Sequence, residues 1–166
     1  IMFSRFLSSL SSRSKSEVLL APLAGTVIPL SEVRDSTFSS GTLGDGVAIR
    51  PTGTTVVAPA DGKVKAIFPT GHAVALHTDN GLDVLIHLGL DTYKLEGRHF
   101  TVHAQVGDTV KCGDVLIEFD RDAILAEGYD LTAPILICNA VEFSSIKGSV
   151  GETVHELDKL MTARER

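Results

Sequence analysis

Residues His72-Ala-Val-Ala-Leu-His-Thr-Asp-Asn-Gly-Leu-Asp-Val-Leu-Ile-His87 form two alternating apolar runs that are separated by Asn80-Gly81. An Asn-Gly pair between such runs is the strongest short-range signal for a β-hairpin. We therefore expect an antiparallel pair of strands over this segment. If Asn80 and Gly81 are the two loop residues, Val74 lies directly opposite His87.

The same hairpin predicts that two histidines share one face. His72 lies two residues beyond Val74, and side chains two apart on a strand point to the same side. His72 and His87 then become diagonal neighbours, with Cβ atoms about 7–8 Å apart. This expectation depends on the loop, because an odd number of loop residues would place the two histidines on opposite faces.

The remainder of the chain favours an all-β fold. From Glu17 onward, short runs rich in Val, Ile and Leu alternate with Gly, Asp, Asn and Pro. This pattern predicts a barrel or sandwich of short antiparallel strands with few short helical turns. Residues 122–128 predict one such turn, with Asp120 at its N-cap and Gly128 at its end. We expect the charged residues 156–161 to form another helix.

Two segments resemble each other and indicate an internal pseudo-repeat. Val18-Leu-Leu-Ala-Pro-Leu-Ala-Gly-Thr-Val27 and Val56-Val-Ala-Pro-Ala-Asp-Gly-Lys-Val64 share the pattern Ala-Pro-x-x-Gly-x-Val. Each is expected to form a strand–turn–strand unit. Gly-Asp at residues 107–108 and again at residues 113–114 predicts two tight turns around a short strand.

Composition narrows the class of protein. A length of 166 residues with 43% hydrophobic residues is enough for one domain with a real core. The net charge of −6 and the absence of a Lys/Arg cluster after Lys15 argue against nucleic-acid binding. Cys112 and Cys138 are too few for a disulfide framework, so we expect two buried thiols and a reducing, cytoplasmic location.

The N-terminal residues differ from the rest. We expect residues 1–16 to be a flexible tail or linker and residues 17–166 to be the folded domain. The helical spacing of the apolar residues between Phe3 and Leu10 leaves open a weak amphipathic membrane-surface anchor, so the chain is at most peripheral to a membrane. The most apolar stretch, residues 18–30, is too short and interrupted to span a bilayer.

Two neutral imidazoles that converge in an all-β frame suit two kinds of chemistry. One is a metal site. The other is nucleophilic phosphoryl transfer, in which an unprotonated ring nitrogen attacks phosphorus and the second imidazole stabilises the transition state as a hydrogen-bond donor. The pattern of the two histidines alone leaves both open.

The sequence also resembles a known family, the glucose-type enzyme IIA domain of the bacterial phosphoenolpyruvate:sugar phosphotransferase system. The segments that resemble it are Leu43-Gly-Asp-Gly-Val-Ala-Ile-Arg-Pro51, Val57-Ala-Pro-Ala-Asp-Gly62, Phe68-Pro-Thr-Gly-His-Ala73 and Ile86-His-Leu-Gly-Leu-Asp-Thr92. The resemblance implies a β-sandwich built on the internal pseudo-repeat, the duplicated hybrid motif.

The resemblance implies a phosphocarrier that needs no cofactor. By match, His87 accepts a phosphoryl group from the phosphocarrier protein HPr and passes it to the IIB domain of a sugar permease. The resemblance assigns His72 as the helper imidazole, Thr70 as the residue that orients the imidazoles, and the backbone of Gly89 as the group that holds the other ring nitrogen of His87.

The resemblance further implies a partner-binding rim, other partners and a conditional metal. Phe38 and Phe68 match its apolar positions, and Asp35 and Asp91 match its acidic ones. Regulatory partners are implied as well. Zinc is not expected in the isolated protein, although His72 and His87 would hold one if a partner supplied a carboxylate.

Three other functions compete with this one. A zinc metallopeptidase of the lysostaphin type would need a His-x-His pair, which the chain lacks, although His87-Leu-Gly-Leu-Asp91 fits its second motif. A lipoyl or biotinyl carrier would need a lysine at a hairpin tip, where the chain has Asn80-Gly81. A purely binding or structural role would differ from a carrier in failing to accept phosphate.

Overall fold

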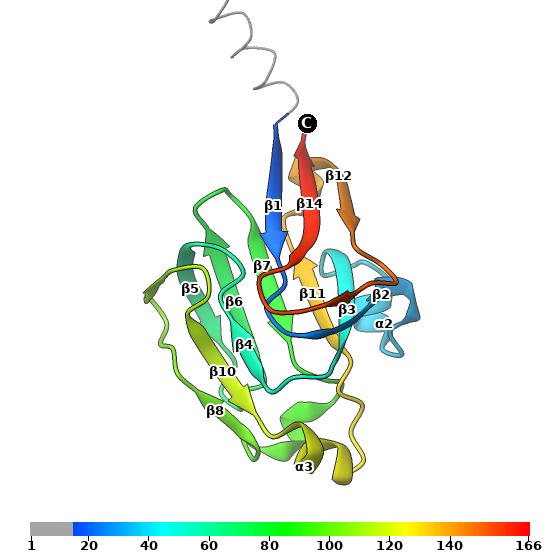
Figure 1. The fold of residues 1–166 in the computed structure, drawn as a ribbon, viewed down its shortest axis with the longest axis vertical. Coiled ribbons are helices and arrows are strands. Elements are labelled where there is room, and N and C mark those ends of the chain that lie inside the picture. Colours follow the sequence, from blue (N-terminus) through cyan, green and yellow to red (C-terminus); the bar gives the residue numbers. More distant parts are fainter. Residues whose placement is uncertain (1–14) are drawn as a thin grey trace, which may run out of the picture.

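An eight-stranded antiparallel sheet contains the 72–87 segment and forms the largest part of the fold (Figure 1). The structure is a computed structural model, and it describes residues 15–166. Along the sheet the strands run β13 (Thr153–Val154), β2 (Gly25–Pro29), β3 (Asp45–Pro51), β11 (Ala133–Ile137), β7 (Asp83–His87), β6 (Ala73–Thr78), β5 (Gly62–Ile67) and β9 (Thr109–Val110).

Two three-stranded sheets complete the architecture. One has the order β1 (Ser16–Leu20), β14 (Lys159–Glu165) and β12 (Phe143–Gly148), and it stands at one end of the molecule in Figure 1. The other has the order β4 (Thr55–Val57), β10 (Val115–Phe119) and β8 (Phe100–Val102). The helices of this part of the chain are short: α2 (Ser36–Ser39), α3 (Arg121–Ala126), and the 3₁₀ turns η1 (Leu30–Glu32), η2 (Thr92–Leu95) and η3 (Ala140–Glu142). The predicted all-β class is confirmed.

The main core lies between the sheets and draws residues from all three. Leu19 of β1, Ile117 of β10 and Ile86 of β7 are each fully buried in it. A second, smaller cluster packs on the other side of the large sheet around Phe38 and Leu90, with members Ile28, Leu30, Val33, Phe38, Ala48, Leu90 and Leu136. Burial of these side chains is the main driving force that fixes the sheets against each other.

The predicted pseudo-repeat is present in the backbone. The amide of Leu20 donates to the carbonyl of Pro59 (3.2 Å), and the amide of Val57 donates to the carbonyl of Pro22 (2.8 Å). Leu20-Ala-Pro22 and Val57-Ala-Pro59 are equivalent positions of the two repeats. Each repeat therefore provides a hydrogen-bond acceptor for a backbone amide of the other repeat, at the point where its strand ends.

The predicted turns and helix are also found. Gly107 and Gly113 both have φ of +94°, and the carboxylates of Asp108 and Asp114 each accept a backbone N–H three residues back at 2.8 Å. Helix α3 begins after Asp120, whose carboxylate accepts the amide of Ala123 at 3.1 Å. These local predictions succeed because the Gly and Asp side chains act within a few residues of themselves.

The predicted helix over residues 156–161 is wrong. These residues form a turn followed by β14, which pairs with β1 on one side and with β12 on the other. Leu160 and Met161 are buried there, at 0% and 1% exposure. The short charged stretch resembles a helix locally, but pairing with strands distant in sequence decides its conformation.

The expectation of two buried thiols is also wrong, since Cys112 and Cys138 are both exposed. Cys112 lies in the loop between the two Gly-Asp turns, and Cys138 follows the end of β11. Cysteine is buried on average over many proteins, but here both cysteines lie in surface segments.

Most of the predicted tail lies outside the described residues. Ser16 is described; it is the first residue of β1 and pairs with Arg164 of β14.

The predicted register of the 72–87 hairpin is shifted by one residue. Ala73, not Val74, lies opposite His87, and His77 lies opposite Asp83. The loop contains three residues, 79–81, because the amide of Thr78 donates to the carbonyl of Leu82 at 2.9 Å and closes the turn there. The hydroxyl of Thr78 also accepts the amide of Leu82, which strengthens this closure.

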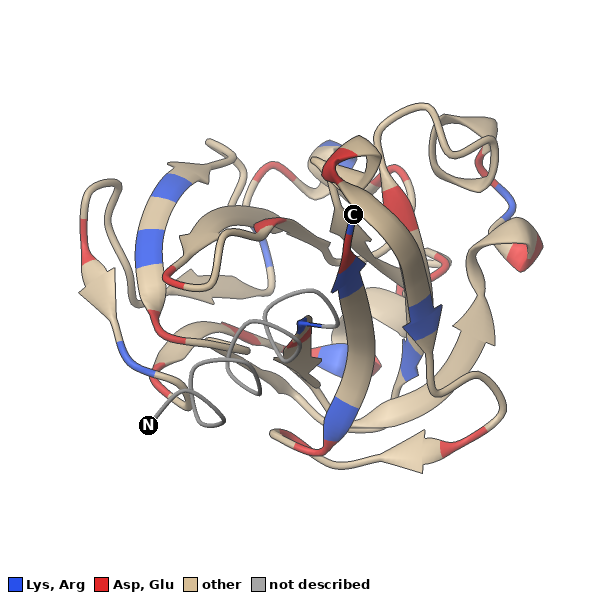
Figure 2. Ribbon diagram, turned by 90° about the horizontal axis from the view of Figure 1, so that it is seen from above, with Lys and Arg blue, Asp and Glu red and all other residues tan. Residues whose placement is uncertain are grey.

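Charged residues are spread over the surface. Figure 2 shows basic positions scattered among acidic ones along the ribbon rather than gathered on one face. Within residues 15–166, no helix combines the length and the apolar character that crossing a bilayer requires.

Candidate functional site

His87 is the last residue of β7 and has one ring nitrogen fixed by the backbone. Its Nδ1 lies 2.8 Å from the carbonyl oxygen of Gly89. Because a carbonyl only accepts, Nδ1 must have the proton, and Nε2 is left with a free lone pair. The geometry therefore selects the tautomer in which Nε2 has the free lone pair.

The carbonyl of Gly89 is held in place by a tightly packed loop. Gly89 has φ of +82°, and a Cβ there would lie 2.5 Å from Cγ2 of Thr92 and 2.9 Å from the carbonyl oxygen of Asp130. The hydroxyl of Thr92 donates to the carbonyl of Leu88, and the amide of Leu90 donates to the carbonyl of Asp130 at 2.9 Å. Glycine is thus required at residue 89 both by conformation and by space.

His72 comes from a turn that precedes β6. The amide of Gly71, which has φ of +72°, donates to the carbonyl of Phe68 at 2.8 Å and closes this turn. The hydroxyl of Thr70 lies 2.6 Å from Nδ1 of His72. If that hydroxyl donates, Nε2 of His72 has the proton and can act as a hydrogen-bond donor.

The two imidazoles lie side by side. Their ring centroids are 4.8 Å apart and their planes are 82° apart. The expected proximity is found although the loop is odd, because His72 lies outside the regular strand and does not follow its alternation. The amide of Leu88 donates to the carbonyl of His72 at 2.7 Å, which joins the two backbone segments at this point.

Aromatic rings enclose the pair. Phe38 lies 4.8 Å from the ring of His87, and Phe68 lies 5.3 Å from the ring of His72 and 6.0 Å from that of His87. The histidines are only 4% and 9% exposed, for His72 and His87 respectively. The site is therefore largely shielded from water.

Burial keeps both imidazoles neutral. It lowers the pKa of His72 to about 4, and the nearby ring of His87 adds to this lowering. Burial also lowers the pKa of His87, although the hydrogen bond to Gly89 and the charge of Asp35 oppose it. At neutral pH both rings are unprotonated, which is the form that a nitrogen nucleophile or a metal ligand requires.

The predicted acidic residues Asp35 and Asp91 line one cavity together with Leu90, and the charge of Asp35 acts on His87. Asp35 is the N-cap of α2, where its carboxylate accepts the amide of Thr37 at 3.0 Å. Helix α2 presents Phe38, which packs into the second cluster with Leu90. Asp91 is exposed, with φ of +59°, at the start of η2.

Other histidines lie elsewhere, near carboxylates. His77, His99 and His103 lie beside Asp83, Glu127 and Glu118, respectively. His155 is exposed. In residues 15–166 no group of three or more His, Cys, Asp and Glu side chains is arranged to hold a metal ion.

Two groups around His87 were missed by sequence reasoning. Thr92 belongs to the quoted motif but was not singled out, and its hydroxyl ties the loop to Leu88. Asp130 supplies a backbone carbonyl from a segment distant in sequence. A backbone contact of that kind leaves no signal in residue types.

The fold and the site define an all-β domain with two adjacent, buried imidazoles in apolar surroundings. Residues 17–143 match the family described as phosphoenolpyruvate-dependent sugar phosphotransferase system, EIIA 1. The chain therefore belongs to this family, as the resemblance indicated.

Individual relatives are components of the same phosphotransferase system. The chain is similar to the PTS system beta-glucoside-specific EIIBCA component of Dickeya chrysanthemi, with 50% identity over 133 residues, which cover 80% of this chain and 21% of that protein. It is also similar to the mannose-specific EIIBCA component of Corynebacterium glutamicum, with 50% identity over 130 residues, or 78% of this chain and 19% of that protein. The chain thus spans about a fifth of the length of the curated relatives it matches.

A solved structure has the same fold. Glucose permease IIA from Mycoplasma capricolum superimposes with a TM-score of 0.80 at 34% sequence identity, and the match covers 89% of this chain and 96% of that chain. The comparisons favour a phosphotransferase component over the metallopeptidase and lipoyl-carrier alternatives.

Proposed function

We propose that this domain is a phosphocarrier that accepts a phosphoryl group on Nε2 of His87 from phospho-HPr and passes it to the IIB domain of a sugar permease. The observation that supports this most directly is the bond from Nδ1 of His87 to Gly89, which leaves Nε2 as the free nucleophile. The lone pair of Nε2 forms the new bond to phosphorus while the bond between phosphorus and its donor atom breaks. No cofactor takes part.

His72 acts as the helper in this proposal. With the hydroxyl of Thr70 donating to its Nδ1, His72 directs an N–H from Nε2 toward the phosphoryl oxygens. In a largely dry site such a donor stabilises the charge that spreads over those oxygens in the transition state. The return step to IIB uses the same contacts.

The partner surface surrounds the two histidines. Phe38 and Phe68 provide apolar contact that excludes water during transfer, and Asp35 and Asp91 pair with cationic side chains of HPr and IIB. The EIIBCA names of the relatives support IIB as a partner. The domain works in the cytoplasm, and a partner that supplies a carboxylate would complete a zinc site at His72 and His87.

Incubation of the protein with phosphoenolpyruvate, enzyme I and HPr tests the proposal. We expect incorporation of one acid-labile, base-stable phosphate per chain, and none in His87→Ala. Labelling of His87→Ala to the level of the parent would contradict the assignment.

The helper role is tested in the same system by adding IIB. In His72→Gln the side-chain amide cannot place an N–H where Nε2 of His72 lies, so we expect label on His87 with slower transfer to IIB, by about 100-fold, as is typical of losing one transition-state donor. Circular dichroism spectra and melting curves establish that the variant is folded. Transfer at the rate of the parent would remove His72 from the mechanism.

A further inference from the structure

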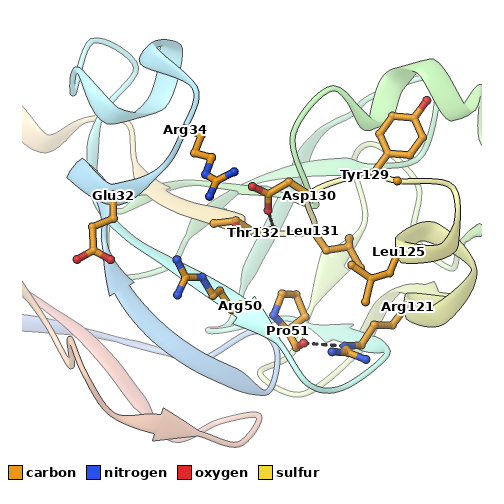
Figure 3. Close-up of a pocket in the computed structure, with 11 residues that line it drawn as sticks. Glu32, Arg34, Arg50, Pro51, Arg121, Leu125, Tyr129, Asp130, Leu131 and Thr132 are labelled. Carbon is orange, nitrogen blue, oxygen red and sulfur yellow. Dashed lines mark hydrogen bonds between the residues drawn. The ribbon is translucent and has the colours of Figure 1, made fainter.

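One cavity is lined by none of the residues predicted for the histidine site, although it shares Asp130 with the loop of His87, where the carbonyl of Asp130 accepts the amide of Leu90. It has a volume of about 480 Å³ and lies between η1, the end of β3, α3 and residues 128–132 (Figure 3). This size falls in the range of pockets that bind small molecules, about 300–1,000 Å³. The function proposed above makes no use of it.

Three arginines from separate segments line this cavity. Arg34 follows η1, Arg50 lies in β3, and Arg121 begins α3. Figure 3 shows Arg34 and Arg50 together on one side of the cavity. A concentration of three guanidinium groups stands out in a chain with a net charge of −6.

Two of these arginines, Arg34 and Arg50, form no ion pair with a carboxylate within residues 15–166, although the carboxylate of Asp130 lines the same cavity. The third arginine, Arg121, donates from Nε to the carbonyl of Pro51 at 2.8 Å, and this hydrogen bond holds its side chain against the end of β3. Guanidinium groups bind phosphate oxygens through two parallel N–H bonds, so Arg34 and Arg50 are free to bind a phosphate between them.

The rest of the lining suits a ligand with hydroxyl groups. Asp130 contributes a carboxylate, of which one oxygen accepts the amide of Thr132 at 2.9 Å. The other oxygen repels a bare phosphate but can accept a hydrogen bond from a hydroxyl. Leu125 and Leu131 lie together on the side away from Arg50, whereas the ring of Tyr129 points away from them (Figure 3). Apolar walls with a few convergent polar groups are typical of sites for small polar metabolites.

We propose that this cavity binds a phosphate monoester of a small polyhydroxylated molecule, that is, a sugar phosphate. Arg34 and Arg50 bind the phosphate, and the remaining carboxylate oxygen of Asp130 accepts a hydroxyl. The proposal goes beyond the phosphocarrier function, because binding here needs neither His72 nor His87.

Calorimetric titration of the full chain with glucose 6-phosphate, inorganic phosphate and glucose tests the proposal. We expect saturable binding of glucose 6-phosphate at one site per chain, and weaker binding of the other two probes. Arg34→Gln and Arg50→Gln should each weaken binding by about tenfold or more, since each removes a guanidinium group that can donate two charge-assisted hydrogen bonds to the phosphate. Both side chains are exposed, so both variants should fold normally.

Lys63→Gln is the matched control, because Lys63 is an exposed cation on β5 that does not line the cavity. It should bind glucose 6-phosphate like the parent. The proposal is overturned if glucose 6-phosphate gives no saturable binding below roughly 10 mM, or if the arginine variants bind as the parent does. Equal affinity for inorganic phosphate would overturn the sugar part of the assignment. The titration involves no phosphoryl transfer, so its result is independent of the carrier test.

Discussion

Gly89 determines how His87 is presented. Its carbonyl accepts the Nδ1 proton, and its φ of +82° places that carbonyl in a loop where Thr92 and Asp130 leave no room for a Cβ atom. A single backbone position thereby sets the tautomer of the proposed nucleophile.

Replacing Gly89 with alanine should damage both stability and the site. The added Cβ meets backbone and methyl atoms at a positive φ, so we expect a loss of about 1–3 kcal/mol in the free energy of unfolding, measured with urea. Phosphorylation of His87 should slow as well, because its carbonyl acceptor moves. Gly107→Ala is the control: Gly107 has φ of +94°, but nothing lies within 4 Å of the added Cβ. Equal losses in both variants would show that packing around Gly89 does not matter.

The tip of the 72–87 hairpin is hydrogen-bonded to a side chain from outside the hairpin. Oδ1 of Asn139 accepts the amide of Asp83 at 2.9 Å, and its Nδ2 donates to the carbonyl of Gly81 at 2.9 Å. Asn139 follows β11, the other neighbour of β7 in the sheet. The hairpin that precedes His87 is thus attached to the sheet at its tip as well as along β7.

Asn139→Ala should lower the free energy of unfolding by about 1–3 kcal/mol, because it leaves an amide and a carbonyl without partners. Thermal melting and urea unfolding measure this loss. His77→Ala removes an exposed pair with Asp83 on the same hairpin and should cost less than about 1 kcal/mol. A smaller effect for Asn139→Ala than for His77→Ala would contradict the bracing role.

The same hairpin shows how much the sequence determines. Asn80-Gly81 correctly predicts two antiparallel strands, because the signal is local. The loop length is not predictable in the same way, since the hydrogen bonds of Thr78 to Leu82 add a residue to the loop. The convergence of the two histidines was expected from strand alternation, but it depends on the turn at Gly71, which takes His72 out of the strand.

Pairing between distant segments is what local patterns do not report. Residues 156–161 were expected to be helical, but residues 159–161 begin the strand β14, which its partners β1 and β12 define. The site residues were placed by matching motifs to a family, whereas the contact of Asp130 with the loop of His87 became visible only in the fold. The pseudo-repeat was predictable because the same short pattern occurs twice.

The two buried neutral imidazoles make the free energy of unfolding of the whole domain depend on pH. Above pH 6.5 these groups are neutral in both folded and unfolded chains. Below it the unfolded chain takes up protons that the folded chain refuses until the pH reaches the lowered pKa, about 4 for His72. Stability contributed by these groups is therefore lost as the pH falls from about 6.5 toward 4.

His72→Gln should reduce the stability that is lost as the pH falls. Between pH 7 and pH 5 the parent should lose on the order of 1 kcal/mol more than the variant, because the glutamine does not titrate. Urea unfolding at the two pH values gives both differences. An identical pH dependence in parent and variant would show that the His72 ring is not held neutral by the fold.

In the proposed mechanism the fold offers Nε2 of His87, and no other ring nitrogen, to phosphorus. Nitrogen-15 NMR of the phosphorylated protein, with assignment of the histidine rings, tests it most directly. We expect a single phosphohistidine, at Nε2 of His87, with Nδ1 still protonated and bonded to Gly89. Phosphorus bound to Nδ1 of His87, or to His72, would contradict the account.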